Sequence, residues 1–463
     1  MSAARLISKN KLLILAISVA SFMVNLDTYI INVSLPSIVS GFRASTADVS
    51  WVAMAYNLTV VSLLLIFGKL GDKIGLKPLF ITGFVIFTIS SMLCGCAPSL
   101  LWLVAGRLLQ GVGASILYAL PQAMIPKYLP KEQRGMAFGI LATAAALGIT
   151  LGSPLSGIIT GLYSWRWVFF INLPVGLIAL IILQYSIPAK DTTTKKEPHF
   201  DILGAALSFI MALAFTFWIN RGAIHGWTSP KMALCLLFAF IAFAVFIKRE
   251  KTTKYPLLDL SLFNNTTFNF ANIAMFLVSA FLAGTNFLMP FYLTEIKGLV
   301  PAKVGAVFMI YSISYMLTGL ISGKLSRKFP AEILCAGSMF LASITLASFT
   351  YVLNFEGIYC VMAYFILTGI SFAFFITSNN NFVMSMAPEN KEGMVSGAHR
   401  MIGRMGMLCG VAVFEAVFTF CGTGNLIIGF RTAYTLGAAM CFAAMLFSLN
   451  KFSLKKAVRG ESV

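Results

Sequence analysis

The sequence predicts an all-α membrane protein with fourteen transmembrane helices and both termini in the cytoplasm. Hydrophobic residues make up 59% and charged residues 11% of 463 positions, and the mean hydropathy is +0.87, outside the range of soluble domains. A helix needs about 20 apolar residues to cross a bilayer. Such stretches lie near 12–34, 51–69, 78–97, 101–123, 136–158, 167–187, 203–220, 231–249, 269–291, 304–323, 331–353, 357–378, 395–419 and 429–449. They are too long and too continuous for barrel strands, so helices are the predicted spanning structure.

The basic residues predict the orientation. Most of the 34 Lys and Arg residues fall between spans on the side of the N-terminus, which the positive-inside rule assigns to the cytoplasm. All six tryptophans lie at or near predicted outer ends of spans, as an interfacial aromatic belt requires. Topology therefore explains the net charge of +18 without a nucleic-acid partner. The first apolar stretch is too long for a cleaved signal peptide and contains Asp27.

The cysteines and histidines offer no catalytic or metal-binding set. The eight cysteines lie inside or at the ends of spans, where they are expected to pack as small apolar residues. His199, His225 and His399 are scattered at loops or span ends. We therefore expect no enzyme activity, no metal site and no cofactor.

Two charged interruptions, at 187–199 and 248–263, bracket the spans 203–220 and 231–249 between two groups of six. The run FGKLGDK from Phe67 is echoed by SGKLSRK from Ser322, each at the end of the second span of its group. The predicted domains are an N-terminal six-helix bundle at 1–190, two inserted helices at 191–260 and a C-terminal six-helix bundle at 261–463. Transporters with duplicated halves bind substrate between them.

Arg107, in the run RLLQGVGAS that also contains Gln110, Gly111 and Gly113, lies within a predicted span. An arginine there costs about 3 kcal/mol on insertion scales, so it is by default functional. Asp27, in the first span, is its expected partner. Burial would favour the neutral acid and a nearby cation the carboxylate, so Asp27 could load and release a proton. The alternative is a static pair that fixes two helices.

Glu415 is the second acidic residue well inside a span, with Arg400 and Arg404 nearer the cytoplasm. The sequence favours neither a structural nor a functional role for Glu415. With Asp27, it would give each half of the molecule one buried carboxylate, so that a proton and a cationic substrate could compete within one cavity.

Seven motifs occur in order: LDTYIINVSLPSI, GKLGDKIGLK, RLLQGVGAS, GITLGSPLSGIITG, SWRWVFFINLPVG, HFDILGA and PLLDLSLFNNTTF. Together they resemble the fourteen-span drug:H+ antiporters of the major facilitator superfamily, over nearly the whole chain. The resemblance implies the major facilitator fold, with two inserted helices between its six-helix bundles. It also associates Asp27 with proton handling.

Two motifs carry further expectations from this resemblance. The loop containing Gly68, Asp72, Lys73, Gly75 and Lys77 resembles a conformational latch, although Leu76 replaces a common basic residue. Its glycines permit a tight turn, and Asp72 is expected near the start of the next helix, where the dipole favours a carboxylate. The alternative is a basic loop that merely turns.

Gly148, Gly152, Pro154 and Gly157 resemble the antiporter helix motif, which indicates export, although Ser153 and Ile158 replace usual glycines. Small residues at this spacing allow close helix approach and the proline a bend, so packing alone is the alternative.

The predicted function is a proton-coupled antiporter of the multidrug efflux type, connected with antibiotic resistance, which exports amphiphilic or cationic compounds by alternating access. Its partners would be the lipid bilayer, protons and a small amphiphilic substrate; it would be a monomer in the inner (cytoplasmic) membrane, crossing it many times. Proton coupling would use Asp27, Arg107 and Glu415. Substrate-cavity candidates are Tyr56, Asn57, Tyr118, Gln122, Asn286, Tyr315 and Asn379. A dedicated exporter of one lipid, peptide or metabolite remains open, whereas the proline-glycine pattern argues against an uptake symporter.

Overall fold

The computed structural model describes residues 3–186, 202–253, 260–325, 328–353, 355, 357–386, 392–422 and 425–449. Within them, fourteen segments are helical, long and apolar enough to span a membrane, which confirms the predicted number. The interruption at 187–199, including His199, and residues 254–259 lie outside this description.

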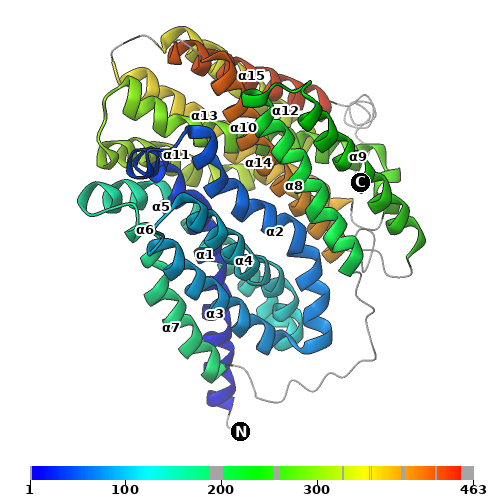
Figure 1. Ribbon diagram of the computed structural model, residues 1–463. Helices are drawn as coiled ribbons and strands as arrows, with labels where there is room; N and C mark the ends of the chain where they lie inside the picture. Colours follow the sequence, from blue (N-terminus) through cyan, green and yellow to red (C-terminus); the bar gives the residue numbers. More distant parts are fainter. Residues whose placement is uncertain are drawn as a thin grey trace. The chain divides into compact units, whose positions relative to one another are not determined.

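The helices follow one another without strands in the described part of the chain (Figure 1). In order they are α1 (Ala3–Phe42), α2 (Thr46–Ile74), α3 (Leu76–Gly95), α4 (Leu100–Tyr128), α5 (Lys131–Leu162), α6 (Trp167–Phe170), α7 (Asn172–Ser186), α8 (Ile202–His225), α9 (Pro230–Thr252), η1 (Leu260–Asn264), α10 (Thr266–Phe291), η2 (Tyr292–Ile296), α11 (Pro301–Leu325), α12 (Ala331–Val352), α13 (Tyr359–Ser385), α14 (Glu392–Cys421) and α15 (Leu426–Ser448).

Short polar side chains begin several of these helices. Ser45 accepts a hydrogen bond from the backbone N–H of Asp48 at the start of α2, and Ser99 does the same for Trp102 at the start of α4. Asn265 and Asn425 cap α10 and α15. Each cap satisfies a backbone donor that the first helical turn leaves without a partner.

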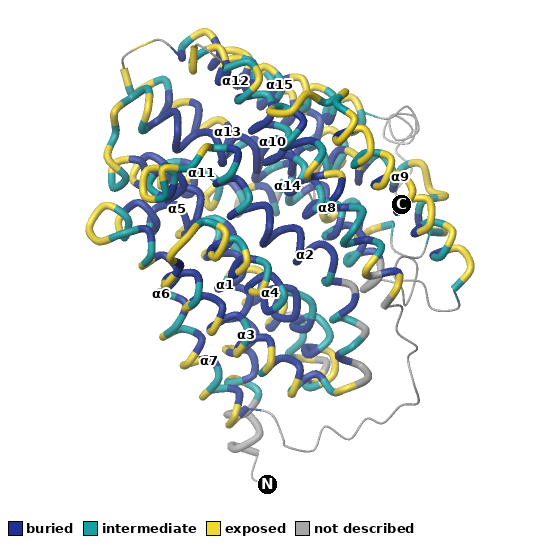
Figure 2. Tube along the Cα trace, in the orientation of Figure 1, coloured by how far each residue is buried: buried dark blue, intermediate teal, exposed yellow. Residues whose placement is uncertain are grey.

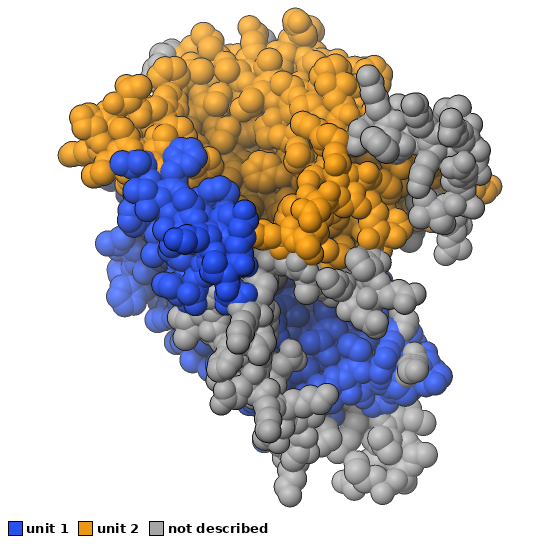
Figure 3. Space-filling view, turned by 90° about the vertical axis from the view of Figure 1, so that its right-hand side faces the viewer, with its two compact units in different colours: residues 1–214, 237–257 blue, residues 215–236, 258–463 orange. Residues whose placement is uncertain are grey.

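The chain divides into two compact units (Figure 3). Unit 1 comprises residues 1–214 and 237–257, and unit 2 comprises 215–236 and 258–463. The inserted helices α8 and α9 each contribute one part to each unit, so the three-segment domain division stays a prediction. Buried residues concentrate in α1, α2, α10 and α14, whereas α9 is largely exposed (Figure 2), as expected for a helix with lipid on most of its sides.

In unit 1, glycines let helix backbones approach closely. A Cβ on Gly148 of α5 would lie 2.5 Å from the carbonyl oxygen of Phe22 in α1. A Cβ on Gly111 of α4 would lie 2.8 Å from the carbonyl oxygen of Tyr56 in α2. Both distances are too short for a real side chain, so these positions require glycine or a shift of the helices.

Unit 2 repeats the same contacts. A Cβ on Gly406 of α14 would overlap the carbonyl oxygen of Phe276 in α10, and one on Gly369 of α13 would lie 2.9 Å from that of Tyr311 in α11. The number of residues between Tyr56 and Tyr311 is the same as the number between the starts of the repeated runs FGKLGDK and SGKLSRK. The packing therefore gives the sequence repeat a common structural register in the two units.

One local prediction was wrong. Asp72 lies within the last turn of α2, which ends at Ile74, and not near the start of α3, which begins at Leu76. The chain turns at Gly75, whose φ of +95° suits glycine. Asp72 therefore lies at a helix C-terminus, where the dipole does not favour a carboxylate.

Candidate functional site

Asp27 and Arg107 meet inside unit 1, as the sequence predicts. Nη1 of Arg107 on α4 lies 2.5 Å from Oδ2 of Asp27 on α1, and each side chain is only 1% exposed. Such a pair is costly to desolvate and is stable only when further hydrogen bonds satisfy both groups.

Two neutral amides complete the coordination of the carboxylate. Nε2 of Gln110 and Nδ2 of Asn172 donate to Oδ1 of Asp27 at 2.9 and 3.0 Å. The same two amides donate to Oγ of Ser91, at 2.7 and 3.3 Å. The carboxylate thus links α1 to α4 and α7, and the two amides extend the cluster to α3 through Ser91.

Arg107 is held from three further directions. Its Nε donates to the carbonyl oxygen of Val52 at 2.9 Å, and its Nη1 donates to Oε1 of Gln110 at 2.7 Å. The guanidinium carbon lies 4.2 Å from the centre of the Tyr56 ring, a cation–π geometry. Tyr56 in turn donates from its hydroxyl to the carbonyl oxygen of Val24. These contacts fix the guanidinium independently of Asp27.

The motif glycines bring the helices to this cluster. Gly111 and Gly113 follow Gln110 on α4, and added Cβ atoms would overlap the α2 backbone at Tyr56 and the α3 backbone at Phe87. On α5, Gly148 and Gly152 pack against α1 at Leu26 and Ile30, on either side of Asp27. The run RLLQGVGAS and the antiporter-like motif therefore serve one site.

Glu415 is fully buried in unit 2. Its Oε2 accepts a hydrogen bond from Nδ2 of Asn220 on α8 at 2.6 Å, and its Oε1 accepts one from Oγ1 of Thr419 at 2.7 Å. Both of these donors are neutral, whereas Asp27 also lies against the guanidinium of Arg107. The two carboxylates therefore have different surroundings.

His399 lies near the start of α14, at a span end as predicted, and is a buried link between helices. Its Nδ1 lies 2.9 Å from Oδ1 of Asn272 on α10, and its Nε2 lies 2.9 Å from Oδ1 of Asn380 on α13. The amide of Asn272 donates to the carbonyl oxygen of Phe268, which leaves its oxygen for the imidazole. His399 thus ties α14 to two neighbours.

The substrate-cavity candidates occupy varied surroundings. In unit 1, Tyr56 is buried beneath Arg107, Asn57 donates to the carbonyl oxygen of Ala53 in its own helix, and Tyr118 and Gln122 are half-buried. In unit 2, Asn286 is buried and Tyr315 stacks on Tyr311. Their role in substrate binding stays a prediction.

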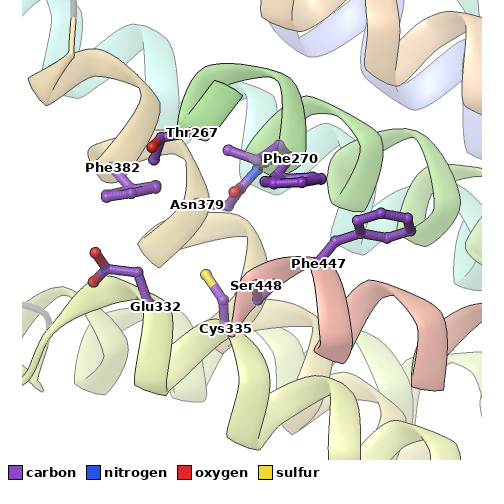
Figure 4. A pocket seen from close by; sticks show the side chains of 9 residues that line it. Thr267, Phe270, Glu332, Cys335, Asn379, Phe382, Phe447 and Ser448 are labelled. Carbon is purple, nitrogen blue, oxygen red and sulfur yellow. Dashed lines mark hydrogen bonds between the residues drawn. The ribbon is translucent and has the colours of Figure 1, made fainter. Parts of the chain in front are cut away.

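Asn379, the remaining candidate, lines a cavity of about 20 Å³ in unit 2 (Figure 4). Its amide donates to the carbonyl oxygen of Ala271 at 3.3 Å. Glu332 and Cys335 of α12 lie on the opposite wall in this view. The space is large enough for about one water molecule, and not for an amphiphilic substrate.

The predicted latch lies at the α2–α3 turn. Gly68 has open space around its Cα, Gly75 makes the turn, and Lys77 is half-buried. The side chains of Asp72 and Lys73 lie outside the described part of the structure, so the latch stays a prediction.

Sequence reasoning missed Ser91, Asn172 and Asn220. Asn172 stands within the SWRWVFFINLPVG motif and Asn220 is polar in an apolar span, which could have marked both as interhelical donors. Ser91 carried no comparable signal.

Comparison with known families identifies the superfamily over most of the chain. The family model described as Major Facilitator Superfamily matches residues 17–411 and 272–461. The chain belongs to the Major Facilitator Superfamily. This assignment makes it a multi-pass secondary transporter of the cytoplasmic membrane and not an enzyme, which confirms those predictions.

The names of similar proteins in this superfamily point to different substrates. The riboflavin transporter RibZ of Clostridioides difficile is 29% identical over 454 residues, 96% of this chain and 98% of that protein. The methylenomycin A resistance protein of Bacillus subtilis is 28% identical, covering 94% and 92% of the two chains. The multidrug transporter protein MdtP of Bacillus subtilis is 32% identical, covering 69% and 59%.

Solved structures support the superfamily fold. A bacterial homolog of the human lysosomal transporter Spinster, in an inward-facing and occupied conformation, matches with a TM-score of 0.67 and 13% identity, covering 97% and 98% of the two chains. A D-xylose-proton symporter matches with a TM-score of 0.67 and 14% identity, covering 95% and 97%. At these identities the likeness concerns the fold alone.

Proposed function

We propose that this transporter is a drug:H+ antiporter that exports amphiphilic or cationic compounds by alternating access. The observation that carries the proposal is the Asp27–Arg107 pair, buried in unit 1 and supported by Gln110 and Asn172. A buried acid whose donors lie on two other helices, α4 and α7, responds to movement of those helices, because such a movement changes which donors it has. That is the property a proton-coupling site needs.

In the proposed cycle, Asp27 takes up a proton in one conformation and releases it in the other. Protonation neutralises the carboxylate and so breaks its ion pair with Arg107. Arg107 then keeps its hydrogen bonds to Val52 and Gln110 and its contact with the Tyr56 ring. Coupling requires only that proton and substrate each favour a different conformation. The relatives named for methylenomycin resistance and multidrug transport support export of toxic compounds.

A second candidate is a dedicated carrier of one planar metabolite such as riboflavin. The relative named as a riboflavin transporter covers nearly the entire chain, which favours this candidate over the other single-substrate exporters. The same proton site could drive it.

Transport into everted membrane vesicles tests both candidates. We expect ethidium to accumulate when a proton gradient is imposed and not after an uncoupler is added. Asp27→Asn should abolish this accumulation. The matched control is Asn25→Ser, since the Asn25 amide bonds only within its own helix, to the carbonyl oxygen of Ser21. Gradient-independent accumulation, or full activity of Asp27→Asn, would contradict proton coupling, and transport of riboflavin but not ethidium would favour the second candidate.

A further inference from the structure

The inserted helix α8 contributes a side chain to the surroundings of Glu415. Both Asn220 and Glu415 are 0% exposed, and the 2.6 Å bond between them joins α8 to α14. We propose that Asn220 is a positioning residue for Glu415, so that the inserted helix is part of the second acidic site and not a spacer between the halves.

Thr419 and Asn220, which both donate to Glu415, belong to different helices. Thr419 lies one turn further along α14 and donates to Oε1, so it moves together with the carboxylate. Asn220 donates to Oε2 from another helix. Displacement of α8 along or away from α14 therefore removes the Asn220 donor and leaves the Thr419 donor in place.

The end of α8 is anchored to α14 by a second contact. The ring of Trp227 lies 5.2 Å from that of Phe420. The indole also covers Gly222, where a Cβ would overlap it. Gly226, with a φ of +81°, makes the turn that brings Trp227 back to this position. The hydrogen bond and the ring contact thus fix the same end of α8 against the same stretch of α14.

Alignment of equivalent positions in the two units also marks Glu415 as a feature of unit 2. Gly148 and Gly152 of α5 correspond to Gly406 and Gly410 of α14, because each pair packs on the equivalent helix, α1 or α10. In this register Glu415 takes the place of Gly157. A position that carries no side chain in unit 1 thus carries a buried carboxylate in unit 2, together with a donor from a helix inserted into the repeat.

The role of this contact in transport rests on the proposed function. In that function, protonation of Glu415 would depend on the distance between α8 and α14. The ionisable side chains of the surrounding helices that lie at least partly buried include Arg221 of α8, Arg404, Cys409 and Cys421 of α14, Tyr364 of α13 and Tyr434 of α15. The helix α10 has no ionisable side chain. An experiment must therefore isolate Glu415 from these groups.

Infrared titration of the purified protein isolates it without any substrate. The carboxyl C=O stretch that disappears in Glu415→Gln reports protonated Glu415. In Asn220→Leu, which keeps the bulk but cannot donate, we expect the pH midpoint of that band to rise by about one unit, because the ionised carboxylate loses a donor. The matched control is Thr216→Val, one turn earlier on α8, where a buried hydroxyl has no hydrogen-bond partner in the described structure.

The outcomes are distinct. A raised midpoint in Asn220→Leu and an unchanged one in Thr216→Val would support the inference. Equal midpoints in the wild type and Asn220→Leu, or the same shift in both variants, would overturn it. If Asn220→Leu does not fold, Asn220→Ala in the same titration replaces it with the same expectation. Gradient-driven ethidium transport is scored separately, so a failure of the proposed antiport leaves the infrared result on Asn220 readable.

Discussion

Phe365 of α13 stands in unit 2 where Arg107 of α4 stands in unit 1. Each precedes by one turn the glycine that packs on the carbonyl oxygen of Tyr56 or Tyr311. The guanidinium carbon of Arg107 lies 4.2 Å from the centre of the Tyr56 ring, and the Phe365 ring centre lies 6.2 Å from that of Tyr311. The same register places Phe281 at the position of Asp27. The ionic cluster of unit 1 is therefore replaced in unit 2 by aromatic rings.

The first prediction concerns the stability of the ion pair. Asp27→Asn should destabilise the protein by about 3–5 kcal/mol, because Arg107 would remain buried without its anion. The double variant Asp27→Asn, Arg107→Gln should be more stable than Asp27→Asn alone, since no buried charge remains. Thermal unfolding in detergent measures the difference. A double variant no more stable than the single one would mean that Arg107 is compensated by its other contacts.

The second prediction concerns the amide donors. Asn172→Leu removes the bonds to Asp27 and Ser91, and a hydrogen bond to a charged group contributes about 1.5–3 kcal/mol. Gradient-driven transport should fall about tenfold or more, with a shifted pH profile. Thr143→Val, which loses only a bond to Gly139 within α5, is the control. An unchanged pH profile in Asn172→Leu would limit Asn172 to packing.

The sequence was enough to predict the fourteen spans and the Asp27–Arg107 pair, because long apolar stretches and isolated charges within them are strong local signals. Asn172, Ser91 and Asn220 were not predicted, since most polar residues in spans bond to their own helix, as Asn57 and Thr59 do. Which of them faces a neighbour depends on helix rotation and packing. Asp72 was misplaced because Gly75, and not Gly68 or Gly71, makes the turn.

The third prediction concerns close packing of α5 on α1. Gly148→Ala places a Cβ 2.5 Å from the carbonyl oxygen of Phe22 and 2.9 Å from the backbone nitrogen of Leu26, so the helices must separate beside Asp27. We expect a loss of about 1–3 kcal/mol of stability and reduced transport. Gly139→Ala on the same helix meets nothing within 4 Å and should be neutral or slightly stabilising. Equal behaviour of the two variants would contradict the packing argument.

The last prediction concerns the orientation of the chain in the membrane, which the distribution of Lys and Arg predicts. With both termini in the cytoplasm, a fluorescent protein fused after Val463 should fluoresce, because it folds there. Alkaline phosphatase fused after Trp227, in the turn between α8 and α9, should be active, because seven spans place that turn outside. The opposite pair of results would reverse the orientation. It would also place the basic segments on the outer side, against the positive-inside rule, and direct the proposed proton cycle the other way.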